Sequence, residues 1–140
     1  MKLNPYLLLD GTAEEALAFY ADVFDAADSL DIMKYGEMPE DMGGVPEGAE
    51  NLVANGNIKV GENEIHISDR VSQWHGDYTG ISGNTIQISL GDVDAAQKYF
   101  DALAVGGTVT MAPAQTFWSP LFGTLTDKFG VEWMVNVTQE

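Results

Sequence analysis

The segment NPYLLLDGTAEEALAFYADVF, residues 4–24, contains a short apolar stretch, a glycine turn and the spacing typical of an amphipathic helix. The same order returns in NTIQISLGDVDAAQKYFDALA, residues 84–104. A shift of 80 residues aligns the two segments and places Gly11 opposite Gly91. Two copies of one strand–turn–helix unit indicate that the chain is an internal repeat.

Both helices are expected to begin at a capping residue. Thr12 is followed three positions later by Glu15, which is the capping-box pattern, and Asp92 occupies the matching position in the second copy. Apolar residues recur at helical spacing in both copies, at Ala16, Leu17, Phe19, Tyr20 and Phe24 and at Val93, Ala96, Tyr99, Phe100 and Leu103. Each helix therefore has one face to bury.

Three strands are expected after each helix. Those of the first half are residues 30–35, 52–60 and 64–69; those of the second half are residues 106–113, 116–127 and 131–137. The last two strands of each half form a hairpin, turning at 61–63 and at 128–130. Each half therefore has the order βαβββ. The chain is predicted to be one α+β domain over residues 1–140. Its first module lies at about 1–69, a linker at about 70–83 and the second module at about 84–140.

A βαβββ module buries one face of its sheet under the helix and leaves the other face open. Alternation predicts that the helices cover Ile65, Ile67, Ile86, Ile88, Val131, Trp133 and Val135. The opposite faces hold polar positions, at Glu64, His66 and Ser68, at Thr85, Gln87 and Ser89, and at Glu132, Met134 and Asn136. Two twisted sheets can bring such faces together around a cup, and these side chains would line it. The pattern is equally compatible with faces that point into water.

The charge of the chain restricts its partners. Asp and Glu total 22 against six Lys and Arg, for a net charge of −16, so neither nucleic acid nor an anionic membrane is an expected partner. The chain has no cysteine, which excludes disulfides and thiolate chemistry and fits a cytoplasmic protein. No apolar run approaches the roughly 20 residues of a membrane span.

The tandem modules resemble the vicinal oxygen chelate superfamily, which includes glyoxalase I, extradiol dioxygenases and the bleomycin- and fosfomycin-resistance proteins. The closer resemblance is to its PhnB-like branch. It rests on residues 4–24, on KYGEMPED, residues 34–41, on GENEIHISD, residues 61–69, and above all on QTFWSPLFGTLTDKFGVEWMVN, residues 115–136. The resemblance covers essentially the whole chain. It implies a curved, cup-shaped mixed sheet with the helices on its outer face.

Metal enzymes of this superfamily hold their ion with residues of the first and last strand of each module. The resemblance places Pro5, His66, Thr85 and Met134 at those positions. A proline, one imidazole, a hydroxyl and a thioether do not make a site for Mg²⁺, Zn²⁺ or Ni²⁺, so no cofactor is predicted. A second set, Glu64, His66, Gln87 and Glu132, would suit a divalent metal if two strands slipped by two residues, and it stays an open alternative.

Without a metal, His66 is the side chain of this set that exchanges a proton near neutral pH. The predicted catalytic residues are His66 and Glu132, and the alternative for His66 is a hydrogen-bonded wall residue. The predicted ligand contacts are Tyr6, Glu64, Thr85, Gln87, Trp118, Met134 and Asn136. Residues 35–51, which include Met38 and Met42, could cover the cup or form a plain surface loop.

Three functions fit these residues. The favoured one is a metal-free protein that binds a small molecule in its cup, with catalysis left open. The others are a metal-dependent lyase, isomerase or antibiotic-resistance-type enzyme, and a non-catalytic sequestering protein. A homodimer is expected as well, because members of the superfamily pair modules across chains and an exposed sheet edge invites a partner.

Overall fold

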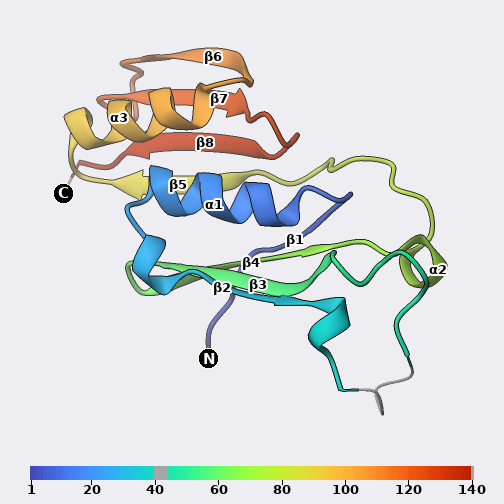
Figure 1. Cartoon of the computed structure of the whole chain (residues 1–140). Helices are drawn as coiled ribbons and strands as arrows, with labels where there is room; N and C mark the ends of the chain where they lie inside the picture. The colour runs from blue at the N-terminus through green and yellow to red at the C-terminus, as the bar shows by residue number, and fades with distance from the viewer. Residues whose placement is uncertain (40–43, 140) are drawn as a thin grey trace. The chain divides into compact units, whose positions relative to one another are not determined.

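A computed structural model describes residues 1–39 and 44–139 of the chain. The chain divides into two compact units, Met1–Thr79 and Gly80–Glu140, which are coloured from blue to green and from yellow to red in Figure 1. Each unit contains one four-stranded mixed sheet and one long helix.

The first unit contains strand β1 (Tyr6–Leu9), helix α1 (Ala13–Val23) and strands β2 (Asp31–Lys34), β3 (Val53–Val60) and β4 (Asn63–Asp69). The strand order is β1-β4-β3-β2, with β1 parallel to β4 and the other pairs antiparallel. A short helix, α2 (Ser72–His75), follows β4 inside the predicted linker at about 70–83.

The second unit repeats this arrangement. It contains strand β5 (Ile86–Leu90), helix α3 (Val93–Ala104) and strands β6 (Thr108–Ala114), β7 (Phe122–Thr126) and β8 (Glu132–Val137), in the order β5-β8-β7-β6. Again the first strand runs parallel to the last strand, and the other pairs are antiparallel. The tandem βαβββ modules and the α+β class are therefore confirmed.

Each helix covers one face of its own sheet. Helix α1 packs on β3 and β4, and α3 packs on β6, β7 and β8. The positions that alternation assigns to the helices are buried at Ile65, Ile67, Val131, Trp133 and Val135, and half-buried at Ile86 and Ile88. Helix and sheet approach closely at Gly56 of β3, where an added Cβ would overlap Leu17 Cδ1. The apolar core of each module therefore lies between its helix and its sheet, and the other sheet face carries the polar residues.

The two helices begin differently. Asp92 accepts a hydrogen bond from the Ala95 N–H at 2.8 Å, which confirms the cap of α3. The capping box expected at Thr12 is wrong, because the Thr12 side chain makes no cap hydrogen bond. Instead, the Ala13 N–H donates to Asp69 Oδ1, 3.0 Å away at the end of β4. A buried carboxylate at a helix N-terminus satisfies an N–H and interacts favourably with the helix dipole, so it replaces the local cap.

The strands of the two modules do not follow the 80-residue shift. Tyr6 lies opposite His66, whereas the matching pair of the second sheet is Gln87 and Met134, so the first strands correspond at a shift of 81. The helices keep the shift of 80, because the turn before α1 is one residue longer than the turn before α3. Gly11 lies in that longer turn at φ 76°, a left-handed conformation that glycine adopts without strain. The superfamily's ligand positions are therefore wrongly assigned to Pro5 and Thr85. Tyr6, one residue after Pro5, lies opposite His66, and Gln87, two residues after Thr85, lies opposite Met134.

The long loop of the first unit packs on its own module where it is described. Tyr35, Ala49 and Val71 form a small buried cluster, and Met38 and Val45 pack against it. Burial raises the pKa of the Tyr35 phenol, whose hydroxyl donates to the Asp69 carbonyl oxygen at 3.0 Å. Met42 lies outside the described residues, and the role of the loop as a cover stays a prediction.

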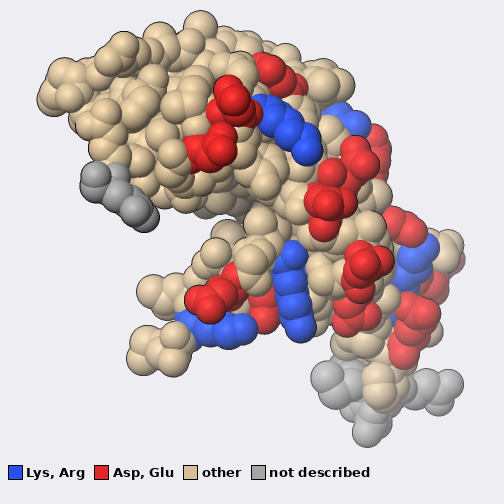
Figure 2. Space-filling model, turned by 90° about the vertical axis from the view of Figure 1, so that its left-hand side faces the viewer, with Lys and Arg blue, Asp and Glu red and all other residues tan. Residues whose placement is uncertain are grey.

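Charged side chains of both signs lie on the face shown in Figure 2. On the face shown in Figure 2, Asp and Glu side chains form several separate groups, with Lys and Arg side chains beside some of them. No helix among residues 1–39 and 44–139 has both the length and the apolar character that a membrane crossing requires.

Candidate functional site

The open face of the first sheet brings together side chains from β1 and β4. Tyr6 and His66 lie opposite each other in the parallel pair, and their rings are stacked, with centroids 6.0 Å apart and planes 7° apart. The Tyr6 hydroxyl donates to Ser68 Oγ at 3.2 Å. Because side chains on one strand alternate between faces, Glu64, His66 and Ser68 all lie on the side of the sheet away from α1.

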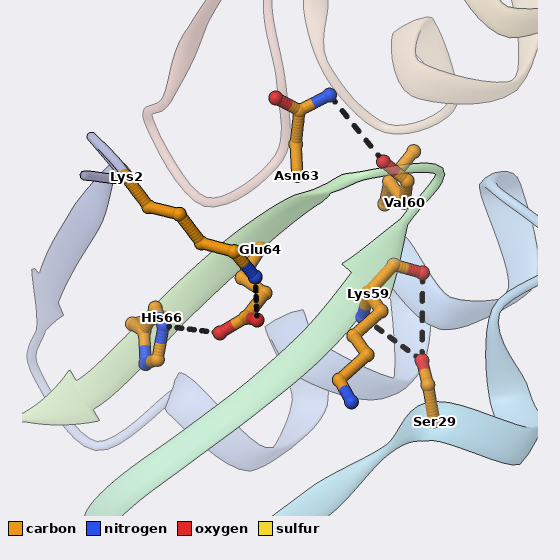
Figure 3. A network of polar contacts seen from close by, with 7 residues as sticks. All are labelled: Lys2, Ser29, Lys59, Val60, Asn63, Glu64 and His66. Atoms are coloured by element: carbon orange, nitrogen blue, oxygen red, sulfur yellow. Dashed lines mark hydrogen bonds and ion pairs between the residues drawn. The ribbon is translucent and has the colours of Figure 1, made fainter.

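Glu64 connects His66 to the N-terminal segment. Its Oε2 lies 3.2 Å from His66 Nε2, and its Oε1 accepts a hydrogen bond from Lys2 Nζ at 3.0 Å (Figure 3). The hydrogen bond from Lys2 and the charge of its ammonium group hold the pKa of the Glu64 carboxyl below its usual value, and His66 adds to this effect. Tyr6, His66, Glu64 and Lys2 therefore form one continuous chain of contacts: a ring stack, a histidine–carboxylate contact and an ion pair.

A shallow hollow lies next to this chain of contacts. Its volume is about 490 Å³, and its walls are Lys2, Lys59, Gly61, Glu62, Asn63 and Glu64. Lys59 of β3 lies opposite Glu64 of β4, so both side chains belong to the open face. Two of the six basic residues of this acidic chain therefore line one hollow beside His66.

The open face of the second sheet is arranged in the same way but carries other chemistry. Gln87 lies opposite Met134, and Ser89 lies opposite Asn136. Gln87 Nε2 donates to Ser89 Oγ at 2.7 Å. The Asn136 side-chain oxygen is buried and has no hydrogen-bond partner in the described part of the chain. Glu132 is half-buried at the start of β8, opposite Thr126.

Three aromatic residues form a cluster before and within β7. The Phe117 and Trp118 rings meet edge to face with centroids 4.7 Å apart, and Trp118 meets Phe122 in the same way at 5.3 Å. Phe117 is 97% exposed and Trp118 is 50% exposed, so this cluster is accessible within its own unit.

The predicted site residues are thus divided between two sheets. Tyr6, Glu64 and His66 lie together on the first sheet, and Gln87, Glu132, Met134 and Asn136 lie on the open face of the second. Thr85 lies just outside β5 and is exposed. Whether the two open faces line a single cup, as the sequence analysis expects, stays a prediction.

The donors that surround His66 on the open face of the first sheet do not fit a transition-metal site. They are one imidazole, which contacts Glu64, and one carboxylate, which an ammonium group already neutralises. Zinc and nickel sites in proteins use three or four such ligands. Nowhere in residues 1–39 and 44–139 do three His, Asp or Glu side chains gather closely enough to hold a metal. The alternative set of Glu64, His66, Gln87 and Glu132 has two members on each sheet, and it stays untested.

Sequence reasoning missed Lys2, Lys59 and the hydrogen bond between Tyr6 and Ser68. Lys59 could have been found, because the hairpin turn at Gly61 sets a register that places it opposite Glu64. Lys2 gives no signal in the sequence, since it lies outside any repeat or strand pattern. The structure also assigns buried roles to Asp69 and Asp127, which hold backbone groups in place.

Comparison with known proteins agrees with this architecture. YjdN of Escherichia coli K12 is 33% identical over 150 residues, with 100% of this chain and 97% of the relative covered. PA1353 from Pseudomonas aeruginosa is 31% identical in sequence, and its crystal structure matches with a TM-score of 0.88. The match covers 100% of this chain and 99% of PA1353. A PhnB protein from Bacillus cereus is 26% identical in sequence, and its structure matches with a TM-score of 0.77. The match covers 99% of this chain and 100% of the PhnB protein.

A family model matches residues 2–135, which is nearly the whole chain. The match spans the first module and the second module as far as Val135 of β8. The chain belongs to the Glyoxalase/Bleomycin resistance protein/Dioxygenase superfamily, with PhnB-like proteins among its structural neighbours.

Proposed function

We propose that the open face of the first sheet binds a small molecule without a resident metal, and that His66 is the residue that exchanges a proton with it. The observation that carries this proposal is the arrangement of His66, stacked on Tyr6 and in contact with Glu64. These contacts fix the plane of the imidazole and one of its nitrogens. A ring held in this way can meet a ligand in a single orientation, which a freely rotating side chain cannot.

The tautomer of His66 follows from the contact with Glu64. Lys2 keeps Glu64 ionised, so this carboxylate is an acceptor, and the imidazole nitrogen that faces it carries the hydrogen. The other ring nitrogen points away from Glu64 in Figure 3. In the neutral ring that nitrogen has a lone pair, so it can accept a proton from a bound molecule, and Glu64 then stabilises the resulting imidazolium.

The hollow beside Glu64 sets the size and polarity of the ligand. Its volume of about 490 Å³ lies within the range of small-molecule sites. Tyr6 supplies an exposed ring, and Lys2, Lys59 and Asn63 supply polar side chains. The Tyr6 ring, which lies outside the hollow, and the walls of the hollow together favour a small molecule with an apolar part that packs on Tyr6 and a polar part near the two lysines. The lack of cysteine fits a reducing compartment, and we propose that the protein acts in the cytoplasm.

A thermal-shift screen tests this proposal. Protein treated with a chelator is screened against a library of small organic acids, amides and aromatic metabolites. Compounds that raise the melting temperature of the chain are then tested on the Tyr6→Ala and His66→Ala variants, with Trp74→Ala, an exposed aromatic outside the sheet, as the matched control. We expect hits that are lost in the first two variants and kept in the third.

Hits that bind all three variants equally would refute the proposed site. Turnover of a hit that disappears in His66→Ala would establish catalysis, whereas binding without turnover would mark a sequestering protein. Hits that stabilise the chain only after a divalent metal is added back would contradict the metal-free proposal.

A further inference from the structure

Helix α2 begins just after β4, the last strand of the first sheet (Figure 1), and side chains of its own segment hold both of its ends. At the C-terminal end, the guanidinium group of Arg70 donates hydrogen bonds to the carbonyl oxygens of His75 and Gly76. At the N-terminal end, the Val71 N–H donates to Nδ1 of the His75 imidazole at 3.0 Å. One ionisable ring therefore closes the first turn of this helix.

The helix in turn packs on the small buried cluster of the first unit. Val71 is 3% exposed and belongs to this cluster together with Tyr35 and Ala49. The ring of Trp74 meets the Tyr35 ring edge to face, with centroids 5.5 Å apart and planes at 67°. Trp74 is still 49% exposed, so the position of α2 decides whether this indole rests on Tyr35 or lies in water.

The hydrogen bonds around Val71 fix the tautomer of His75. Nδ1 lies 3.0 Å from the Val71 nitrogen and 3.1 Å from the Val71 oxygen. That oxygen already accepts the backbone N–H groups of Trp74 and His75, each at 2.9 Å, whereas the Val71 N–H has Nδ1 as its acceptor. Nδ1 therefore carries the lone pair, and the hydrogen of the neutral ring is on Nε2.

Protonation of His75 removes this arrangement. An imidazolium ring has a hydrogen on both nitrogens, so Nδ1 can no longer accept, and the buried Val71 N–H loses its partner. The proton also adds a positive charge to a helix whose other end contacts the Arg70 guanidinium, and like charges repel. Both effects act against the docked helix.

Further ionisable groups near α2 among the described residues do not offset this charge. Burial raises the pKa of the Tyr35 phenol, so this group stays neutral. The Asp69 carboxylate already accepts hydrogen bonds from backbone N–H groups of α1 and β3. Asp77 follows α2 and is exposed, so water and salt screen its charge.

We propose that α2 is a pH-sensitive switch. With His75 neutral, the helix is docked and Trp74 rests on Tyr35. With His75 protonated, the first turn opens and Trp74 moves into water. The docked form is present at about pH 8 and is lost as the pH falls toward 5, the range in which histidine gains a proton. Acid thereby separates the long loop that begins at Tyr35 from the segment that leads into the second unit.

Fluorine NMR of the full-length protein labelled with 5-fluorotryptophan tests this switch. The chain has three tryptophans, and Trp74→Phe identifies the signal of Trp74. Between pH 8 and pH 5 this signal should move toward that of free 5-fluorotryptophan. Loss of one hydrogen bond to a buried N–H corresponds to about a tenfold change in the ratio of docked to undocked helix. The signal of Trp133, which is 1% exposed, should stay in place.

Three variants assign the response to His75. His75→Asn keeps a side-chain acceptor near the position of Nδ1 but does not titrate, so its Trp74 signal should stay docked at both pH values. His75→Lys carries the charge without the acceptor and should be undocked already at pH 8. His66→Gln removes the other histidine of the chain and should leave the response unchanged. Nitrogen NMR of the wild type at pH 8 should show the His75 hydrogen on Nε2.

Several results would overturn the proposal. They are a Trp74 signal that does not move between pH 8 and pH 5, the same movement in His75→Asn, and loss of the movement in His66→Gln. A Trp133 signal that moves together with Trp74 would indicate general unfolding and would overturn it as well. So would a hydrogen on Nδ1 of His75 at pH 8. None of these results bears on the proposed His66 site, which is judged by ligand binding.

Discussion

Removal of the buried carboxylate of Asp127 is expected to destabilise the second unit severely. This side chain lies in the turn between β7 and β8 and is 4% exposed. Its Oδ1 accepts hydrogen bonds from the Phe129 N–H at 2.9 Å and the Val131 N–H at 3.0 Å, and its Oδ2 accepts one from Trp133 Nε1 at 2.8 Å. One carboxylate thereby fixes the hairpin turn and the orientation of the largest buried side chain.

The size of the effect follows from the groups left behind. In Asp127→Ala, the Val131 N–H and the Trp133 Nε1–H stay buried and lose this partner. Each buried donor without a partner costs about 1 to 3 kcal/mol, so the expected loss of unfolding free energy is about 2 to 6 kcal/mol. Single domains have total stabilities of about 5 to 15 kcal/mol, so this loss is a large fraction of the whole.

Urea unfolding followed by circular dichroism measures this loss. The matched control is Asp101→Ala, which removes an exposed carboxylate that accepts a surface hydrogen bond from Gln97. It should change the unfolding free energy by less than about 0.5 kcal/mol. In a Trp133→Phe background, which removes one of the three donors, Asp127→Ala should cost about 1 to 3 kcal/mol less than in the wild type. A loss no greater than that of Asp101→Ala would refute the structural role assigned to Asp127.

Three further predictions concern packing, charge and assembly. Gly123→Ala should destabilise the chain by about 1 to 3 kcal/mol in urea unfolding, because the new Cβ meets Phe100 Cε2 and Pro113 Cα. The control Gly91→Ala should be nearly neutral, because its new Cβ has nothing within 4 Å. Equal losses of unfolding free energy in the two variants would contradict the packing. Lys2→Met should raise the pKa of Glu64 toward its usual value in a carboxyl NMR titration, and Lys2→Arg should keep it low. Because the pKa of Glu64 is lowered on folding, the stability that Lys2 adds is present above the usual glutamate pKa and is lost as the pH falls through the lowered value. The unfolding free energies of the wild type and Lys2→Met should therefore converge in acid. A difference in unfolding free energy that stays constant with pH would contradict the ion pair. Sedimentation at micromolar concentration should show a dimer, since β6 is a sheet edge with Val109 and Met111 exposed, and Val109→Lys should weaken it; a monomeric wild type would reject this.

The fold was predictable because its signals are local and repeated. The alternation in residues 64–68 and 131–137 assigns each side chain to a face without knowledge of its neighbours, and Ile65, Ile67, Trp133 and Val135 lie where it places them. The hairpin turns and the cap at Asp92 are likewise set by a few adjacent residues. Consistent local signals of this kind specify elements and faces.

The details of the site depend on contacts between residues distant in sequence. Asp69 replaces the cap expected at Thr12 from 56 positions away, and Lys2 reaches Glu64 from 62 positions away. The extra residue in the turn at Gly11 moves the pairing by one, so Tyr6 and not Pro5 lies opposite His66. A one-residue change of register moves a side chain to the other face, which is why periodicity alone could not settle which residues meet.

We propose that the lysine–glutamate–histidine–tyrosine chain of contacts on the first sheet acts without a resident metal. Elemental analysis of wild-type and His66→Ala protein, purified without chelators, tests it most directly. We predict nickel, zinc and manganese contents far below one atom per chain in both proteins. Close to one atom per chain in the wild type, lost in His66→Ala, would contradict the claim and favour the set of Glu64, His66, Gln87 and Glu132.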